Sequence, residues 1–220
     1  MMSNKIKKKS TFIDMTAMSD VTVLLLTFFM LTSTFIQKEP VSVSPPQSVS
    51  EVKIPESNIV SILIDPNGKV FMSFDNPKDR EAALREVGKA YNIDFTPEEL
   101  KKFSLLPSFG VPIIGMQKFL GLSPEDQDKV ITNYGIPCDS TDNQFKIWMQ
   151  TARQVWSERI QDVVRENPEL AARKPQLAIA IKADANTPYP LIRDIMNTLQ
   201  ELREQRYNLI TSLRNAPAGA

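Results

Sequence analysis

Residues 15–37 are the only segment of this 220-residue chain that is apolar and long enough to cross a membrane. They read MTAMSDVTVLLLTFFMLTSTFIQ. As a helix they would be about 34 Å long at roughly 1.5 Å per residue, which is enough for a hydrocarbon core of about 30 Å. The sequence therefore predicts a single transmembrane helix over residues 15–37.

Asp20 is the only charged side chain within that segment. An ionised carboxylate at the centre of a membrane helix costs about 2.5–3.5 kcal/mol on insertion scales. Such a residue needs a compensating partner, or it changes its protonation state as part of the function. We therefore take ion transport at Asp20 as the leading hypothesis.

The charges before the apolar segment predict its orientation. Lys5, Lys7, Lys8 and Lys9 stand against a single Asp14, and positive charge favours the cytoplasmic side. We expect a cytoplasmic N-terminus over residues 1–14 and an exported C-terminal part. A cleaved signal peptide is the alternative, but no A-x-A-like cleavage site follows and an acid stands where the apolar core begins.

The composition excludes several classes of chemistry. The chain has no histidine, which rules out Ser-His-Asp and Cys-His nucleophiles and every histidine metal site. Its single cysteine, Cys138, allows no internal disulfide, and seven glycines include no phosphate-binding loop. The net charge is zero and there is no basic patch, which argues against nucleic acid. We expect a protein that is not an enzyme and has no cofactor or metal.

Beyond the membrane segment, the chain changes character in three steps. Residues 38–58 contain four prolines and predict an extended tether. Residues 59–64 and 69–74 are β-prone runs joined by Asp-Pro-Asn-Gly, which predicts a hairpin. In residues 77–174, Asn76-Pro77, Thr96-Pro97 and Ser123-Pro124 predict helix starts.

A longer amphipathic helix is predicted from about residue 142 to 166. Trp148 and Trp156 fall on its apolar side, and we interpret them as packed residues and not as a binding site. Residues 77–174 would thus be a mostly helical insertion with a small core of its own.

The final part of the chain returns to mixed α and β character. It predicts a strand over 177–182, a helix capped by Thr187 and running to about 205, and a last strand over 207–213. A flexible tail over 214–220 would follow. The predicted fold is one transmembrane helix plus a small α+β domain, built from 59–76 and 175–213, that carries the helical insertion.

Two polar features have both a functional and an ordinary structural explanation. Thr16, Asp20, Thr27 and Thr34 are spaced by four, seven and seven residues, so they fall near one stripe of a helix. Threonines in membrane helices also simply donate to their own helix carbonyls. Asp184 could serve a site, or it could only form an Asx turn between strand and helix.

The membrane segment and its flanks resemble a known family. DMTAMSDV at 14–21, with LLLTFFM at 24–30, resembles the membrane helix of the ExbD/TolR family. The family's extended V-x-V-x-x-P segment resembles 41–46, its first hairpin resembles 62–72, and its strand–helix unit resembles 179–202. Ala17 replaces the proline that is usual in the family's first motif.

The resemblance implies a proton-driven motor subunit in the inner membrane. The family's proton-coupling aspartate corresponds to Asp20, with Thr16, Thr27 and Thr34 as supporting polar positions. Its members would be homodimers, with a periplasmic domain, inside a ring of an ExbB/TolQ-like multi-pass protein, and would drive a TonB- or TolA-like transducer. Val41 and Val43 of the tether would bind a partner by strand addition.

Three alternatives stay open at this stage. The resemblance does not separate ExbD, which powers TonB-dependent import, from TolR, which works in envelope maintenance. A passive anchor for a periplasmic interaction module is a second reading. A MotB-like stator is a third, although residues 59–213 show no convincing peptidoglycan-binding domain of that type.

Overall fold

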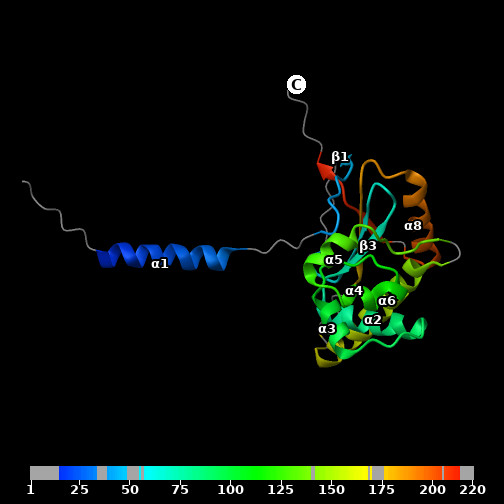
Figure 1. Cartoon of the computed structure of the whole chain (residues 1–220), viewed down its shortest axis with the longest axis horizontal. Coiled ribbons are helices and arrows are strands. Elements are labelled where there is room, and N and C mark those ends of the chain that lie inside the picture. Colours follow the sequence, from blue (N-terminus) through cyan, green and yellow to red (C-terminus); the bar gives the residue numbers. More distant parts are fainter. Residues whose placement is uncertain are drawn as a thin grey trace, which may run out of the picture. The chain divides into compact units, whose positions relative to one another are not determined.

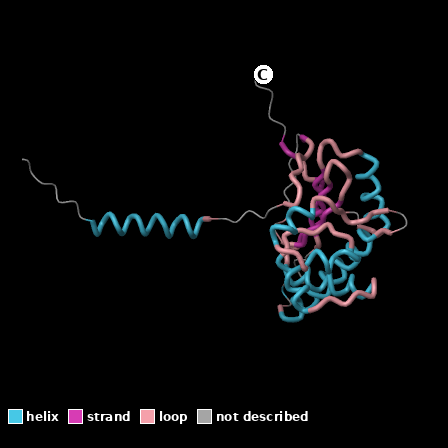
Figure 2. Tube along the Cα trace, in the orientation of Figure 1, coloured by secondary structure: helices cyan, strands magenta, loops and turns pink. Residues whose placement is uncertain are grey.

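The computed structural model describes residues 15–33, 39–48, 55, 57–139, 142–167, 169, 176–204 and 206–213. The chain divides into two compact units, Met1–Gln37 and Lys38–Ala220. The described part of the first unit is essentially the helix α1, and the second holds the sheet and all other described helices (Figures 1 and 2).

Helix α1 spans Met15–Thr32 and confirms the predicted apolar helix. Its 18 residues have a mean hydropathy of 1.6, which makes it long and apolar enough to cross a membrane once. Every residue of α1 is exposed within its own unit. The last part of the predicted segment, residues 34–37, lies outside the described residues.

The second unit is organised around a mixed four-stranded sheet in the order β3-β2-β4-β5. Strands β2 (Ile59–Ile64) and β3 (Val70–Phe74) are antiparallel, which confirms the predicted hairpin. Strands β4 (Ala178–Ala183) and β5 (Tyr207–Leu209) continue the sheet in parallel to β2. The strands are apolar because helices and loops cover the sheet.

The hairpin turn has the geometry that its sequence predicts. The amide of Gly68 donates to the carbonyl of Asp65 at 3.0 Å, and the Asp65 carboxylate accepts the amide of Lys69 at 2.7 Å. Gly68 has φ of 80°, a conformation that side chains disfavour. A Cβ at this position would also lie 2.2 Å from Leu191 Cδ1, so that side chain would have to move to accommodate it.

The helices between β3 and β4 begin where the sequence predicts. Asn76, Thr96 and Ser123 each cap a helix by accepting a backbone amide from its first turn. These helices gather at one end of the unit (Figures 1 and 2). They are α2 (Pro77–Ala90), α3 (Pro97–Leu105), the 3-10 turn η1 (Ile113–Gly115), α4 (Met116–Leu120), α5 (Pro124–Ile131) and α6 (Gln144–Glu166).

Helix α8 (Tyr189–Glu201) differs from the prediction at both ends. Thr187 does not cap it, because its hydroxyl donates to the carbonyl of Asp65 at 3.0 Å and so ties the loop after β4 to the hairpin turn. The helix ends before residue 205 because Arg203 adopts a left-handed conformation with φ of 60°. Beyond it, the single predicted strand is two short ones, β5 and β6 (Ser212–Leu213).

One hydrophobic core joins the sheet to the helices. Trp148 of α6 is completely buried, and its ring centroid lies 4.5 Å from that of Phe109 and 5.9 Å from that of Phe103. The same core includes Ile62 and Ile181 from the centre of the sheet. The buried apolar residues described within 77–174 therefore belong to the same core as the sheet.

Arg80 of α2 is a buried cation that is held by backbone carbonyls. Its side chain donates to the carbonyls of Phe74 and Ser104, both at 3.0 Å, and to those of Leu106 and Asp75. The residue is only 4% exposed, and burial lowers the pKa of its guanidinium, which nevertheless stays charged. One side chain thus joins the end of β3 to the end of α3.

A second arginine, Arg159 of α6, connects this helix to α2 and to the residue before β2. Arg159 Nε lies 2.9 Å from Asp79 Oδ1, and Arg159 Nη2 donates to Asn58 Oδ1 at 2.8 Å. Burial raises the pKa of Asp79, although the charge and hydrogen bond of Arg159 act against that shift. The pair links α6 to α2 and to the residue before β2.

We predict that Arg80→Met lowers the free energy of unfolding by about 3–5 kcal/mol, because it leaves buried carbonyls without a donor. Arg85→Met is the matched control on the same helix, since Arg85 is exposed and pairs only with Glu81 at 2.9 Å. We expect that change to cost less than about 0.5 kcal/mol. Urea denaturation of both variants measures the difference, and equal midpoints would contradict the prediction.

Candidate functional site

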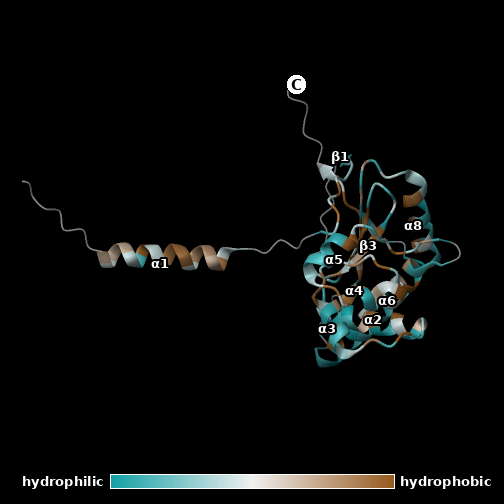
Figure 3. Cartoon of the chain, in the orientation of Figure 1, coloured by the Kyte–Doolittle hydropathy of each residue, from teal (hydrophilic) through white to brown (hydrophobic). Residues whose placement is uncertain are grey.

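Asp20 is the only charged residue of α1. It stands one turn in from the helix start and is exposed, as are the apolar residues around it. Leu24 is 60% exposed and Leu31 is 86% exposed, which is unusual for leucines of a helix in water. In Figure 3, α1 is brown and white along most of its length, whereas α2 and α3 carry much teal.

The helix satisfies most of its own hydroxyl groups. Thr27 Oγ1 donates to the carbonyl of Leu24 at 2.9 Å, Thr22 donates to Met18 at 2.8 Å, and Thr32 donates to Phe28 at 2.8 Å. Thr27 is thus bonded as threonines in membrane helices commonly are. Its hydroxyl alone does not indicate a polar path.

Three residues of the predicted polar stripe, Thr16, Asp20 and Thr27, lie within the described helix α1. At about 100° per residue, Thr16, Asp20 and Thr27 fall within an arc of roughly 40°. Thr34 lies outside the described residues. A single helix cannot enclose a polar path, so this face of α1 needs a partner to complete one.

A second candidate site lies in the other unit, where the tether meets the loop after β4. The amide of Ser44 donates to Asp184 Oδ2 at 2.9 Å, and the amide of Ala185 donates to the carbonyl of Ser44 at 2.9 Å. Two residues further on, the carbonyl of Pro46 accepts the amide of Ser212 at 3.0 Å. The tether is therefore docked by backbone groups.

Asp184 is the centre of this contact. It is 7% exposed, and its other carboxylate oxygen accepts the amide of Asn186 at 2.9 Å. Hydrogen bonds from the amides of Asn186 and Ser44 hold the pKa of Asp184 below its usual value. The Asx turn that the sequence allows is present, and the same carboxylate also holds the tether.

Val41 and Val43 do not point away from the domain in this structure. Val43 is 6% exposed and belongs to the hydrophobic core, and Val41 packs against that core. After Pro45 and Pro46, the tether forms a short strand, β1 (Gln47–Ser48), which pairs in parallel with β6.

Sequence reasoning missed three residues of the dock: Glu39, Ser44 and Lys182. Lys182 Nζ lies 2.7 Å from the Glu39 carboxylate, so the strand that precedes Asp184 also holds the start of the tether. Ser44 was not singled out because it contributes backbone groups only. The opposite charges of Glu39 and Lys182 are visible in the sequence. Because the two residues are 143 positions apart, the sequence does not indicate that they form an ion pair.

A family model matches most of the first half of the chain. The model of the family described as "Biopolymer transport protein ExbD/TolR" matches residues 7–103. No curated protein and no solved structure matches the chain. The matched segment crosses residue 77 and includes α2 and most of α3, so an insertion beginning at that point remains a prediction.

The match also covers α1 with Asp20, the docked tether and the β2–β3 hairpin, in the order that the resemblance implies. Over residues 7–103, this chain is similar to the ExbD/TolR family of biopolymer transport proteins.

Proposed function

We propose that the chain is the proton-carrying subunit of an ExbB–ExbD-type motor in the inner membrane, with Asp20 as the group that takes up and releases the proton. One observation carries this proposal: Asp20 is the sole charge in an 18-residue apolar helix whose side chains are exposed within its own unit. An intramembrane acid almost always faces protein or water, and it is functional by default.

The chemistry of a carboxylate suits this role. Desolvation disfavours its charged form, and a polar or cationic neighbour favours it, so movement between two surroundings is coupled to proton binding. Protonation from the periplasm would neutralise Asp20 and let it leave a polar contact. Loss of the proton toward the cytoplasm would restore the charge and bias the next movement.

The proposed assembly follows from the family. A homodimer, with its N-termini in the cytoplasm and its C-terminal domains in the periplasm, would sit inside a ring of an ExbB/TolQ-like protein. The output would pass to a TonB-like transducer for outer-membrane import. A TolR-like role in envelope maintenance would use the same motor. The alternative from a different functional class is a passive membrane anchor for a periplasmic interaction module.

We further propose that the tether switches between the docked state seen here and a released state that pairs with a partner. The dock consists of a few hydrogen bonds, one of them to the Asp184 carboxylate, the two-residue pairing of β1 with β6, one ion pair, and the packing of Val41 and Val43. Contacts of this kind open locally at low cost. In the released state, Val41 and Val43 would be free to add as a strand to a partner's sheet edge.

For the motor, we predict that Asp20→Asn abolishes proton flux while the protein is still inserted and assembled. Asparagine keeps the size and some hydrogen bonding of aspartate but cannot change its charge. Flux is measured as acidification of vesicles that contain the purified complex, with transport in cells as the second readout. Asp20→Glu should retain part of the flux because it keeps a titratable group.

Thr22→Val is the matched control for that experiment. Its hydroxyl donates to its own helix at Met18, and it lies about 200° around α1 from Asp20. We expect flux within about twofold of the unmodified complex, because only a local hydrogen bond is lost. Wild-type flux in the Asp20→Asn variant would leave the passive anchor as the better reading.

For the tether, we predict that a cysteine at Val41 crosslinks to a partner only in an energised membrane. The native thiol will not interfere, because burial raises the pKa of Cys138 to about 12 and leaves it protonated and slow to react. Crosslinking is scored on gels with and without an uncoupler. Identical crosslinking in both conditions argues against a switch.

The pH dependence of the dock tests the part played by Asp184. Because the pKa of Asp184 is lower when docked than its free value of about 3.9, its contribution is complete above that value and is lost as the pH falls through the docked pKa. A spin label at the exposed Ser42 should thus stay immobile from pH 8 to about 5 and become mobile only below about 4.

Asp184→Asn is the control for that titration, since it cannot ionise and has one acceptor oxygen where aspartate has two. We expect a more mobile label at neutral pH and no acid transition. A transition of unchanged size in this variant would assign the acid effect to another group, such as Glu39.

A further inference from the structure

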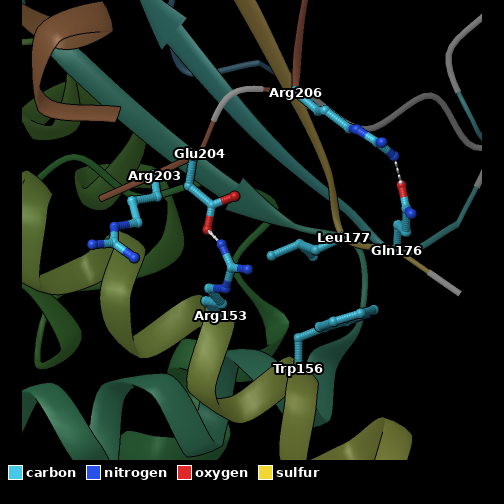
Figure 4. A pocket seen from close by; sticks show the side chains of 7 residues that line it. All are labelled: Arg153, Trp156, Gln176, Leu177, Arg203, Glu204 and Arg206. Carbon is cyan, nitrogen blue, oxygen red and sulfur yellow. Dashed lines mark hydrogen bonds and ion pairs between the residues drawn. The ribbon is translucent and has the colours of Figure 1, made fainter. Parts of the chain in front are cut away.

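A pocket in the second unit lies between α6 and the segments that lead into β4 and β5, and it shares no lining residue with the tether dock. It has a volume of about 360 Å³. Leu177, just before β4, and Trp156 of α6 form an apolar floor (Figure 4). Both are half-buried, so each keeps a surface that a ligand can cover.

The rim of the pocket is cationic. Among the described lining residues, Arg153, Arg203 and Arg206 stand against one acid, Glu204, which gives a local charge of +2. Arg153 is already paired with Glu204 on one side of Leu177. On the other side, Arg206 Nη1 donates only to the neutral amide oxygen of Gln176, at 2.6 Å (Figure 4). Four of the five N–H groups of Arg206 have no acceptor among the residues that the structure describes.

Arg203 occupies a position where an arginine costs backbone energy. It follows α8 in the left-handed conformation, with its amide bonded to Gln200 and that of Glu204 bonded to Leu199. Helices that end this way usually carry glycine at this position. The need to end the helix therefore does not explain why this residue is an arginine. The contribution of its charge to the cationic rim of the pocket does explain it. Within the described residues, its guanidinium has no ion pair.

The pocket also lies at the end of an open sheet edge. Arg206 immediately precedes β5, which pairs with β4 on one side and, in the described chain, with no strand on the other. An extended peptide that adds to this edge in the antiparallel direction ends beside the start of β5. Its terminal carboxylate would then lie near Arg206, which immediately precedes β5.

We propose that this pocket captures the C-terminal carboxylate of an extended peptide from a partner protein, with Arg206 as its direct ligand and Arg203 as supporting charge. Strand addition supplies the backbone bonds and the pocket selects the free chain end, two recognised modes of peptide binding. This site is independent of proton transfer at Asp20 and of the tether dock.

The test uses the full chain in lipid nanodiscs and a fluorescein-labelled β-prone hexapeptide, VTVTVL, with binding followed by anisotropy. We expect the acid peptide to bind at least about tenfold more tightly than its C-terminal amide, because a charge-assisted bond is lost. Arg206→Gln should weaken the acid peptide by a similar factor. Arg193→Gln, an exposed arginine of α8 outside the pocket, should bind as the unmodified chain does.

Arg203→Gly keeps the experiment decisive if Arg206→Gln disturbs folding. Glycine suits the left-handed position, so the thermal midpoint should stay or rise while peptide affinity falls about threefold or more. Equal affinity for acid and amide peptides would overturn the proposal, as would unchanged affinity in both arginine variants. Displacement of the peptide by equimolar phosphate would instead make this a simple oxyanion site and also reject it.

Discussion

The parallel pairing of β2 with β4 is the constraint on which the rest of the second unit depends. It runs over six residue pairs, from Ile59–Ala178 to Ile64–Ala183, so two segments far apart in the chain lie side by side. Parallel strands cannot be joined by a tight turn, and residues 65–177 form the crossover. The pairing also sets the ends of both strands together, which is why Thr187 reaches Asp65 and why Asp184 faces the tether.

Two buried charges of this unit make most of their hydrogen bonds with backbone groups. Arg80 gathers carbonyls at the ends of β3 and α3, and Asp184 gathers amides from the tether and its own loop. The physical principle is the same, but the consequences differ. The partners of Arg80 are fixed inside the core, whereas one partner of Asp184 belongs to a short segment that a few bonds hold. The first arrangement is structural and the second is suited to exchange.

Local features of the fold were predictable from the sequence, and non-local ones were not. The hairpin turn and the caps at Asn76, Thr96 and Ser123 depend on residues within four positions of each other, and all are confirmed. Asp20 stood out because a charge in an apolar helix needs no tertiary information. The role of Asp184 in the dock could not be predicted, because its tether partner lies 140 residues away. Thr187 was assigned wrongly for the same reason: a distant carbonyl competed with the helix amides.

Docking at Val43 also sets how much chain is free to extend. With Val43 buried, it lies eleven positions after Thr32 at the end of α1, and at about 3.6 Å per residue this stretch can span at most about 40 Å. If the chain is released back to Asn58, just before β2, the free length becomes 26 residues, or about 90 Å. In the proposed switch, the dock at Val43 would therefore set the reach of the chain between α1 and β2 to one of two lengths, the longer more than twice the shorter.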